Sequence, residues 1–287
     1  MAGFQLENRR FRAHIMAQGG ELVSLWDKQL QREWIWQPQS GIWAHSATQL
    51  FPVVGRLVQG GVRAEGHFWP LEAHGFLRYQ RFTCLARQAD RLVLAASADG
   101  SAPPCWPWRW QVTTHWVLHR DGLALRQQVI NRDHRPMWFS LGWHPGFALP
   151  VASQPGWRIA FSRAVAGPFP THDRTLSLPV ETPFTHNFRL TPEVFRHGAL
   201  YFGRCRQRRM AVLSPTGREV MALETGTQPW LALWGVPGAD LLCLEPLAGT
   251  TDDPAFDGRL AHKRGIHCLR PGASQAFDVR LRMAVDA

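Results

Sequence analysis

Glycine and proline interrupt this chain so often that they leave no room for a long amphipathic helix. The 287 residues include 25 Gly and 21 Pro. One of the two therefore occurs at about every sixth position, and both interrupt regular helices. Between these breaks, apolar and polar residues alternate over short stretches, which is typical of strands. The sequence therefore predicts an all-β fold, with many short strands arranged as a sandwich or a related architecture.

Two hairpins and several further strands can be predicted individually. Asp121-Gly122 is a favoured two-residue hairpin turn between alternating runs, and Pro215-Thr216-Gly217 separates a second pair of runs in the same way. We expect strands at 20–26, 78–86, 91–96, 109–119, 123–130, 158–161, 209–214, 218–223 and 277–283. No repeat of fixed period, low-complexity linker or clear boundary divides the chain, so we expect one domain over residues 1–287.

The composition excludes several classes of protein. Hydrophobic residues make up 45% and charged residues 19% of the chain, which is unlike a disordered protein. The longest apolar runs, such as 231–236, are too short to span a bilayer as a helix. The N-terminal segment lacks the basic start and apolar stretch of a secretory signal. We therefore expect a cytoplasmic protein with no membrane partner.

The cysteines predict reduced thiols. There are five of them, an odd number, and their wide spacing contains no Cys-x-x-Cys pair. Such a pattern suits a reducing compartment. We expect neither a disulfide nor a zinc site among Cys84, Cys105, Cys205, Cys243 and Cys268.

The formal charge of +10 raises the possibility of nucleic-acid binding. Nearly all of this basic charge is arginine, and the arginines are spread along the chain instead of gathering on one binding element. A basic, solvated surface is the simpler interpretation. We expect no nucleic-acid partner.

A histidine and a glutamate in matching contexts are the best candidates for proton transfer. His144 and Glu245 each lie in an apolar strand, His144 at a strand end, and each is followed by a proline. A following proline favours extended backbone at the preceding residue and thereby fixes the direction of its side chain. Two such groups suffice for general acid-base chemistry, and an imidazolium next to a carboxylate would stabilise both charges.

Several segments, taken in order, resemble the aldose 1-epimerase (galactose mutarotase-like) family. They extend from about residue 20 to the C-terminus, with the least distinctive part at 153–203. The resemblance rests on 50–57 (LFPVVGRL), 72–78 (EAHGFLR), 142–147 (GWHPGF), 233–234 (LW) with 243–246 (CLEP), and 263–266 (KRGI) with 269–272 (LRPG).

The resemblance implies a β-supersandwich that interconverts the α and β anomers of a hexopyranose without a cofactor. Glu245 would then be the general base that removes the proton of the C1 hydroxyl, and His144 the general acid that protonates the ring oxygen. Arg56 and His74 would bind sugar oxygens, and Trp234 would lie near the pocket. Arginine suits the recognition of many hydroxyl groups because its planar donor fork stays charged at any working pH.

One departure from the family pattern leaves other functions open. Many members carry an aspartate that helps to hold the sugar, in a segment corresponding roughly to 197–200, where this chain has no carboxylate. A sugar-binding or regulatory protein without turnover is one alternative. A metal enzyme using His74, His144 and Glu245 is another, although the chain has no short-spaced pair of metal ligands.

A hexose-6-phosphate 1-epimerase is a further alternative. Arginine binds a phosphate dianion well, but no glycine-rich phosphate loop is present and the matched segments resemble the branch of the family that acts on neutral sugars. We therefore expect a free hexose to be preferred. The sequence indicates neither the particular aldose nor the oligomeric state.

Overall fold

The structure, a computed structural model, describes residues 3–98 and 106–285 and consists almost entirely of β-strands. A four-stranded sheet contains, in order, β1 (Gly3–Glu7), β2 (Phe11–Met16), β3 (Leu22–Asp27) and β4 (Arg32–Glu33). Two small antiparallel sheets pair β6 (Gly61–Ala64) with β7 (His67–Pro70), and β12 (Met137–Phe139) with β21 (His267–Leu269).

The main sheet has 14 strands. Its order is β5 (Ala47–Leu50), β13 (Leu141–Ala148), β20 (Leu241–Ala248), β19 (Trp230–Trp234), β16 (Leu200–Gly203), β14 (Arg158–Pro170), β17 (Arg209–Leu213), β18 (Glu219–Glu224), β22 (Ser274–Met283), β11 (Gly122–Asn131), β10 (Trp110–His119), β9 (Arg91–Ala98) and β8 (Thr83–Arg87), with β15 (Phe184–Arg189) paired to β14. Helical structure in the described ranges is limited to the 3₁₀ segments η1 (Leu77–Tyr79), η2 (Pro192–Phe195) and η3 (Leu260–His262).

The predicted all-β class and both predicted hairpins are confirmed. β10 and β11 pair antiparallel around Asp121-Gly122, and β17 pairs with β18 in the same manner. The predicted strand at 78–86 is wrong in its first half. Leu77 is buried in the core, and the N–H groups of Tyr79 and Gln80 donate back to the carbonyls of Phe76 (2.9 Å) and Leu77 (3.0 Å). These local bonds close a 3₁₀ turn, so the strand begins only at β8.

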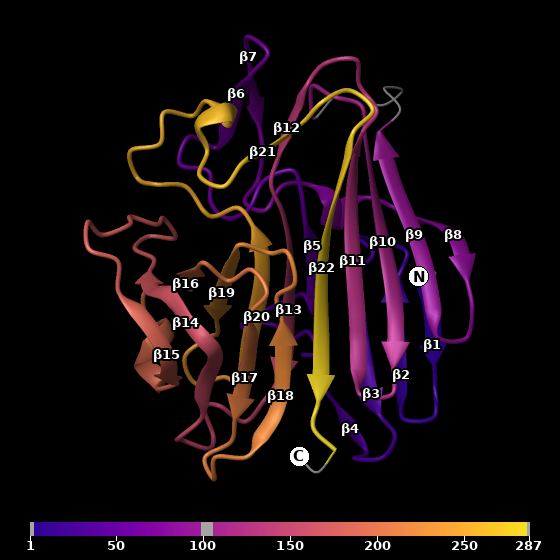
Figure 1. Ribbon diagram of the computed structural model, residues 1–287, viewed down its shortest axis with the longest axis vertical. Coiled ribbons are helices and arrows are strands. Elements are labelled where there is room, and N and C mark those ends of the chain that lie inside the picture. Colours follow the sequence, from indigo (N-terminus) through magenta and orange to yellow (C-terminus); the bar gives the residue numbers. More distant parts are fainter. Residues whose placement is uncertain (1–2, 99–105, 286–287) are drawn as a thin grey trace.

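The long sheet folds back on itself, so that β11 and β10 face β5 and β13 across a buried interior. Figure 1 shows β10, β11 and β22 running along the long axis of the molecule. Gln127 of β11 donates a hydrogen bond to the carbonyl of Gly142 in β13 over 3.1 Å. Trp116 of β10 packs edge-on against Trp143 of β13, with ring centroids 5.8 Å apart. These contacts make the architecture a sandwich, as predicted.

One continuous apolar core joins the sheets. It contains residues of the four-stranded sheet, such as Phe11 and Leu25, together with Trp110, Trp143 and Leu281 of the main sheet. All five side chains are at most 1% exposed. Burying apolar surface in this way stabilises the fold by about 25 cal/mol per Å². The core thus fixes the position of the strands that carry the candidate site.

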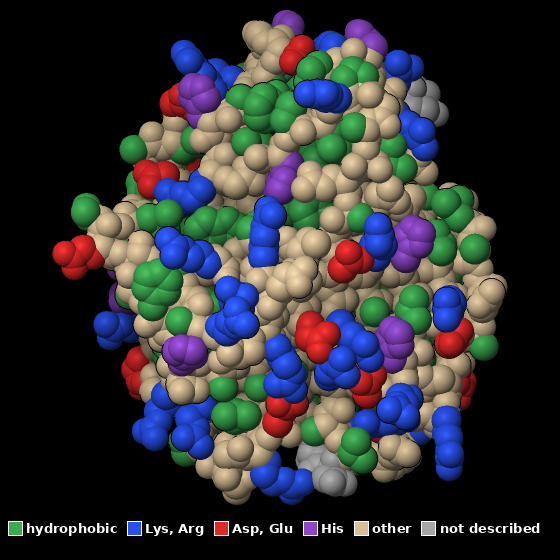
Figure 2. Space-filling model, viewed as in Figure 1, with side chains coloured by type: hydrophobic (Ala, Val, Ile, Leu, Met, Phe, Trp, Pro, Cys, Tyr) green, Lys and Arg blue, Asp and Glu red, His purple; other side chains and the backbone are tan. Residues whose placement is uncertain are grey.

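The described cysteines are free thiols, and the surface carries charges of both signs. Cys84, Cys205, Cys243 and Cys268 are free, and Cys105 lies outside the described residues. Basic side chains are scattered over the face seen in Figure 2, with acidic side chains interspersed among them. No helix in the described ranges combines the length and the apolar character needed to cross a membrane.

Candidate functional site

The register of β13 and β20 places His144 directly opposite Glu245. Leu141 pairs with Ala248 and Gly142 with Leu247 on one side, and Gly146 pairs with Cys243 on the other. Continuing the same register between these pairs sets residue 144 against residue 245. Directly opposed residues on antiparallel strands point to the same face of the sheet. Accordingly, His144 Nε2 lies 3.3 Å from Glu245 Oε1.

His144 lies within β13 and not at a strand end, as the sequence had suggested. It also pairs with Thr48 of the neighbouring strand β5. The imidazole is therefore held by strands on both sides of β13. Only 8% of the His144 surface and 3% of the Glu245 surface are exposed. Both groups are thus buried, and both line a cavity.

The cavity has a volume of about 370 Å³ and contains all five residues predicted for the site. A volume of this size is suitable for a small ligand such as a monosaccharide. Its lining consists of Trp43, Gly55, Arg56, His74, Arg78, His144, Thr171, Arg174, Gly198, Ala199, Tyr201, Trp234, Glu245 and Thr251.

Burial determines where the pair carries its proton. It lowers the pKa of His144 to about 3 and raises the pKa of Glu245 to about 8. Both shifts favour a neutral imidazole and a protonated carboxyl group near neutral pH. The sequence had suggested an imidazolium beside a carboxylate, a form that burial opposes. Both charges would have to be removed from water here, which a single contact does not offset.

His74 presents an N–H group to the cavity. Its Nδ1 accepts a hydrogen bond from the backbone N–H of Gly55 over 3.2 Å, which places the ring proton on Nε2. Burial, followed by the nearby His144, lowers the pKa of His74 well below its ordinary value, so the ring stays neutral. His74 adopts φ +69°, and the next residue, Gly75, has φ +70°. This tight turn brings the imidazole close to His144, with ring centroids 5.6 Å apart.

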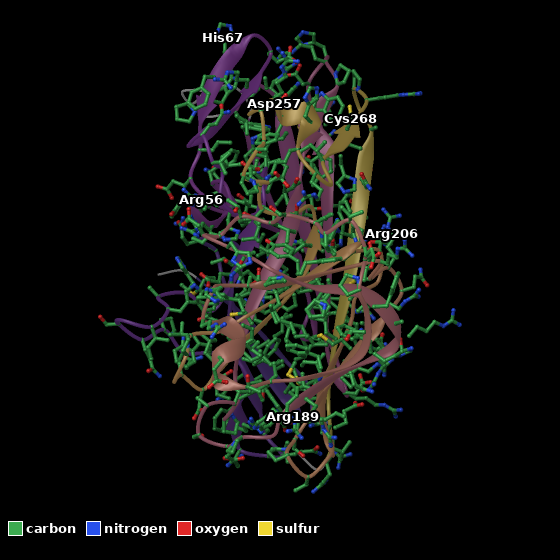
Figure 3. The ribbon with its side chains drawn as sticks, turned by 90° about the vertical axis from the view of Figure 1, so that its left-hand side faces the viewer. Arg56, His67, Arg189, Arg206, Asp257 and Cys268 are labelled. Atoms are coloured by element: carbon green, nitrogen blue, oxygen red, sulfur yellow. The ribbon has the colours of Figure 1, made fainter. Side chains whose placement is uncertain are left out.

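Arg56 lies at the rim of the cavity, in the connection between β5 and β6. Its Nη1 donates to the carbonyl of Asp173 over 2.7 Å and pairs with the carboxylate of the same residue. The backbone N–H of Arg56 donates to Thr251 Oγ1 over 2.9 Å. Figure 3 shows Arg56 at the edge of the molecule, below the hairpin that carries His67. These contacts leave the guanidinium partly exposed at the cavity entrance.

Two tryptophans form an aromatic wall around His144. Trp43 stacks on the imidazole with centroids 4.8 Å apart and an interplanar angle of 28°. Trp234, at the end of β19, contacts both rings edge-on, with centroids 5.8 Å from each. A Cβ atom at Gly146 would lie 2.6 Å from the Trp43 ring. The glycine of the His-Pro-Gly segment therefore allows Trp43 to approach.

More than half of the remaining lining residues could not be predicted from the sequence. Trp43, Thr171, Arg174, Tyr201 and Thr251 belong to no segment that suggested a site. Gly198 and Ala199 form the wall where the family pattern suggests an aspartate. Tyr201 lies in β16, which is separated from β20 by a single strand, β19. This position could have indicated Tyr201, but it is known only once the strand pairing is known.

The described side chains form no evident metal centre. No group of three His, Cys, Asp or Glu side chains in the described part of the chain is arranged to hold a metal ion. His74, His144 and Glu245 lie in one cavity but do not form such a group.

Comparison with known proteins places the chain in a family. The profile of the aldose 1-epimerase family matches residues 3–281. LacX of Lactococcus lactis is 23% identical over 261 residues, which cover 85% of this chain and 87% of LacX.

Two solved structures share the fold. A galactose mutarotase related enzyme from Lactobacillus acidophilus has a TM-score of 0.91 at 23% identity, covering 99% of this chain and 97% of the other. A galactose mutarotase-like protein from Lactobacillus casei has a TM-score of 0.88 at 22% identity, covering 99% and 100%. The predicted galactose mutarotase-like fold is thereby confirmed. Because the family profile covers nearly the whole sequence, the chain belongs to the aldose 1-epimerase family.

Proposed function

We propose that this protein is an aldose 1-epimerase that interconverts the α and β anomers of a free hexopyranose. The proposal rests above all on one observation: His144 and Glu245 oppose each other at 3.3 Å inside the cavity. Anomer exchange requires one proton to leave the sugar and one to be returned to it. A buried acid-base pair within reach of one bound ring can perform both transfers.

The proposed reaction begins with Glu245 as a carboxylate and His144 as an imidazolium. Glu245 removes the proton of the C1 hydroxyl, and the electrons of that O–H bond form the C1=O1 double bond. The bond from C1 to the ring oxygen breaks, and His144 donates its proton to that oxygen. Rotation about C1–C2 presents the other face of the aldehyde. The reverse transfers then close the ring with the opposite configuration.

The form of the pair that burial favours differs from this reactive form only in which of the two groups holds the proton. Burial favours the proton on Glu245, because it raises the pKa of this carboxyl to about 8. Moving it across the 3.3 Å contact to His144 produces the reactive form without changing the net charge. The form that burial favours is also the state left after ring opening. This form of the pair is therefore complementary to the open-chain aldehyde, in which O1 needs a proton donor.

The other predicted residues are suited to hold the sugar. His74 offers an Nε2–H donor because its Nδ1 is occupied by Gly55. Arg56 offers the guanidinium N–H groups not bonded to Asp173. Trp234 provides an aromatic surface, on which the C–H face of a sugar ring can pack.

A hexose 6-phosphate is the second candidate substrate, and one observation favours it. Arg56, Arg78 and Arg174 all line the cavity, and the Arg174 guanidinium forms no ion pair with another described residue. Comparing kcat/KM for a hexose and for its 6-phosphate tests this alternative. A tenfold preference for the phosphate that weakens with added salt would make it the substrate, because guanidinium–phosphate attraction is screened by salt.

Polarimetry with freshly dissolved α- or β-hexose tests the proposed activity. His144→Gln and Glu245→Gln should each lower kcat by about 10²- to 10⁴-fold, the usual contribution of general acid-base assistance. His186→Gln and Glu181→Gln are matched controls, because both side chains are exposed and lie outside the cavity. Wild-type rates in the two site variants, with normal thermal melts, would refute the assignment. Sugar binding without anomerisation by the unmodified protein would indicate a binding protein instead.

A further inference from the structure

The strand register aligns Tyr201 with the proposed acid-base pair. Tyr201 of β16 pairs with Ala232 of β19, and Ala232 pairs with Glu245 of β20. Glu245 in turn opposes His144 of β13. We call Tyr201, Ala232, Glu245 and His144 the cross-strand row. Figure 1 shows the four strands β16, β19, β20 and β13 in this order across the sheet.

The row brings the tyrosine side chain towards Glu245. Opposed residues share one face of a sheet, so all four side chains of the row point the same way. Neighbouring strands are about 4.8 Å apart, and Tyr201 is therefore separated from Glu245 by about 10 Å of backbone. Ala232 between them presents only a methyl group, so the Tyr201 ring can extend over it. Consistent with this, both Tyr201 and Glu245 line the cavity.

The hydroxyl group of Tyr201 has a free hydrogen. Its oxygen accepts a hydrogen bond from the backbone N–H of Thr251 over 3.3 Å, which fixes the position of the oxygen. No acceptor for the hydroxyl hydrogen is found among the residues that the structure places. Tyr201 is only 4% exposed. The hydrogen can therefore be satisfied by Glu245 or by a molecule in the cavity, since a buried donor requires a partner.

Burial keeps this hydroxyl protonated. It raises the pKa of Tyr201 above its ordinary value, and the nearby Glu245 raises it further. The group is thus a permanent hydrogen-bond donor towards the cavity. It also lies just beyond the segment 197–200, where the family pattern suggests a carboxylate that this chain lacks.

We propose that the Tyr201 hydroxyl is a further substrate-binding group, which donates a hydrogen bond to the anomeric oxygen O1 beside Glu245. This inference rests on the proposed function, because it assumes that Glu245 acts on O1. A donor at O1 favours removal of the O1 proton, since the hydrogen bond strengthens as negative charge develops on that oxygen. Tyr201 would then assist both the binding of the sugar and the opening of the ring.

The chain offers a clean comparison because it contains only two tyrosines. Tyr79 is 53% exposed and donates to Glu72 at the surface. Tyr79→Phe is therefore the matched control for Tyr201→Phe. The probes are D-glucose and D-galactose together with the corresponding 1,5-anhydrohexitols, which are the same rings without O1. Calorimetry measures binding of each probe without requiring turnover.

Tyr201→Phe should weaken binding of the hexoses by about three- to tenfold, the worth of one neutral hydrogen bond. Its affinity for the anhydrohexitols should stay within about twofold of the unmodified protein. Unchanged hexose affinity, or an equal loss for both kinds of probe, would overturn the assignment to O1. If the unmodified protein binds hexoses but does not exchange their anomers, the proposed function fails while this comparison still reports on Tyr201.

A second measurement avoids any loss of stability caused by removing the hydroxyl. In the Tyr79→Phe background, biosynthetic 3-fluorotyrosine labels Tyr201 alone. We expect the ¹⁹F resonance to shift on addition of a hexose and to respond much less to the matching anhydrohexitol. Equal ¹⁹F responses to the two probes would show that the hydroxyl does not contact O1.

Discussion

Replacing Glu245 by glutamine should change how the stability of the protein depends on pH. Burial raises the pKa of Glu245 to about 8 in the folded state, whereas a glutamate in an unfolded chain titrates near about 4.3. Between these values the folded protein holds one proton more than the unfolded chain. The stability that this proton provides is fully present below the unfolded pKa. It is lost as the pH rises through the folded pKa.

The size of the effect follows from these two pKa values. Between about pH 7 and pH 8.5 the wild-type protein should lose about 1.2 kcal/mol of unfolding free energy through Glu245 alone. Burial lowers the pKa of several histidines, including His74 and His144, and these groups make both proteins slightly more stable as the pH rises. That contribution is common to the two proteins. The prediction therefore concerns the difference between them.

Urea unfolding followed by tryptophan fluorescence, at several pH values in this range, measures this difference. Relative to the wild type, Glu245→Gln should gain about 1.2 kcal/mol between pH 7 and pH 8.5. Glu181→Gln is the control, because that side chain is exposed. A constant difference between Glu245→Gln and the wild type over this range would refute the argument that burial keeps Glu245 protonated.

Three further predictions concern activity and folding. The pH profile of kcat/KM should be bell-shaped, with an alkaline limb near pH 8 where the His144–Glu245 pair loses its single proton; an unchanged alkaline limb in a His144 variant would contradict this. EDTA should leave the anomerisation rate unchanged, and a loss of activity that zinc or iron restores would instead favour a metal enzyme. Asp252→Asn should lower the unfolding free energy by about 3–5 kcal/mol, because it leaves the buried Lys263 without its carboxylate partner. Asp253→Asn is the control, since Asp253 is a partly exposed partner of Arg264. Equal urea midpoints for the two variants would argue against the prediction.

The sequence predicted the fold class well because the relevant signals are local. Alternation in β10 and β11 and the Asp121-Gly122 turn lie within some twenty consecutive residues. The strand order is different, because β13 pairs with β20 about a hundred positions later and with β5 about a hundred positions earlier. No local pattern encodes such pairings. The single domain and the cytoplasmic location remain predictions.

The candidate site was predicted in part. The segments that resemble the family supplied Arg56, His74, His144, Trp234 and Glu245, and the structure gathers all five around one cavity. Their roles remain proposals. The sequence suggested an ion pair, whereas burial favours a neutral imidazole and a protonated carboxyl group. Burial is a property that a linear sequence does not reveal.

The two prolines after His144 and Glu245 do more than fix the direction of the side chains. The register that opposes His144 to Glu245 also sets Pro145 against Leu244 and Pro246 against Trp143. Proline has no N–H group to donate, and it is rarely found in the interior of a sheet. The pairing of β13 with β20 is interrupted between Gly142 and Gly146. Over the same stretch, the pairing of β13 with β5 and that of β20 with β19 are continuous.

The two prolines therefore coincide with the interruption of the β13–β20 pairing, where the proposed acid-base pair lies. The outer pairings of His144 with Thr48 and of Glu245 with Ala232 are intact, so each strand is held from its far side. Between β13 and β20, the pairing is missing only for residues 143–145, where the two side chains meet. A sheet selected for stability alone would be expected to complete this ladder, since interior strand prolines are unfavourable. Pro145 and Pro246 lie on either side of the opposed His144 and Glu245, and each follows a titratable residue. They thus mark a place where the chain accepts lower local stability and brings the two proposed proton-transfer groups together.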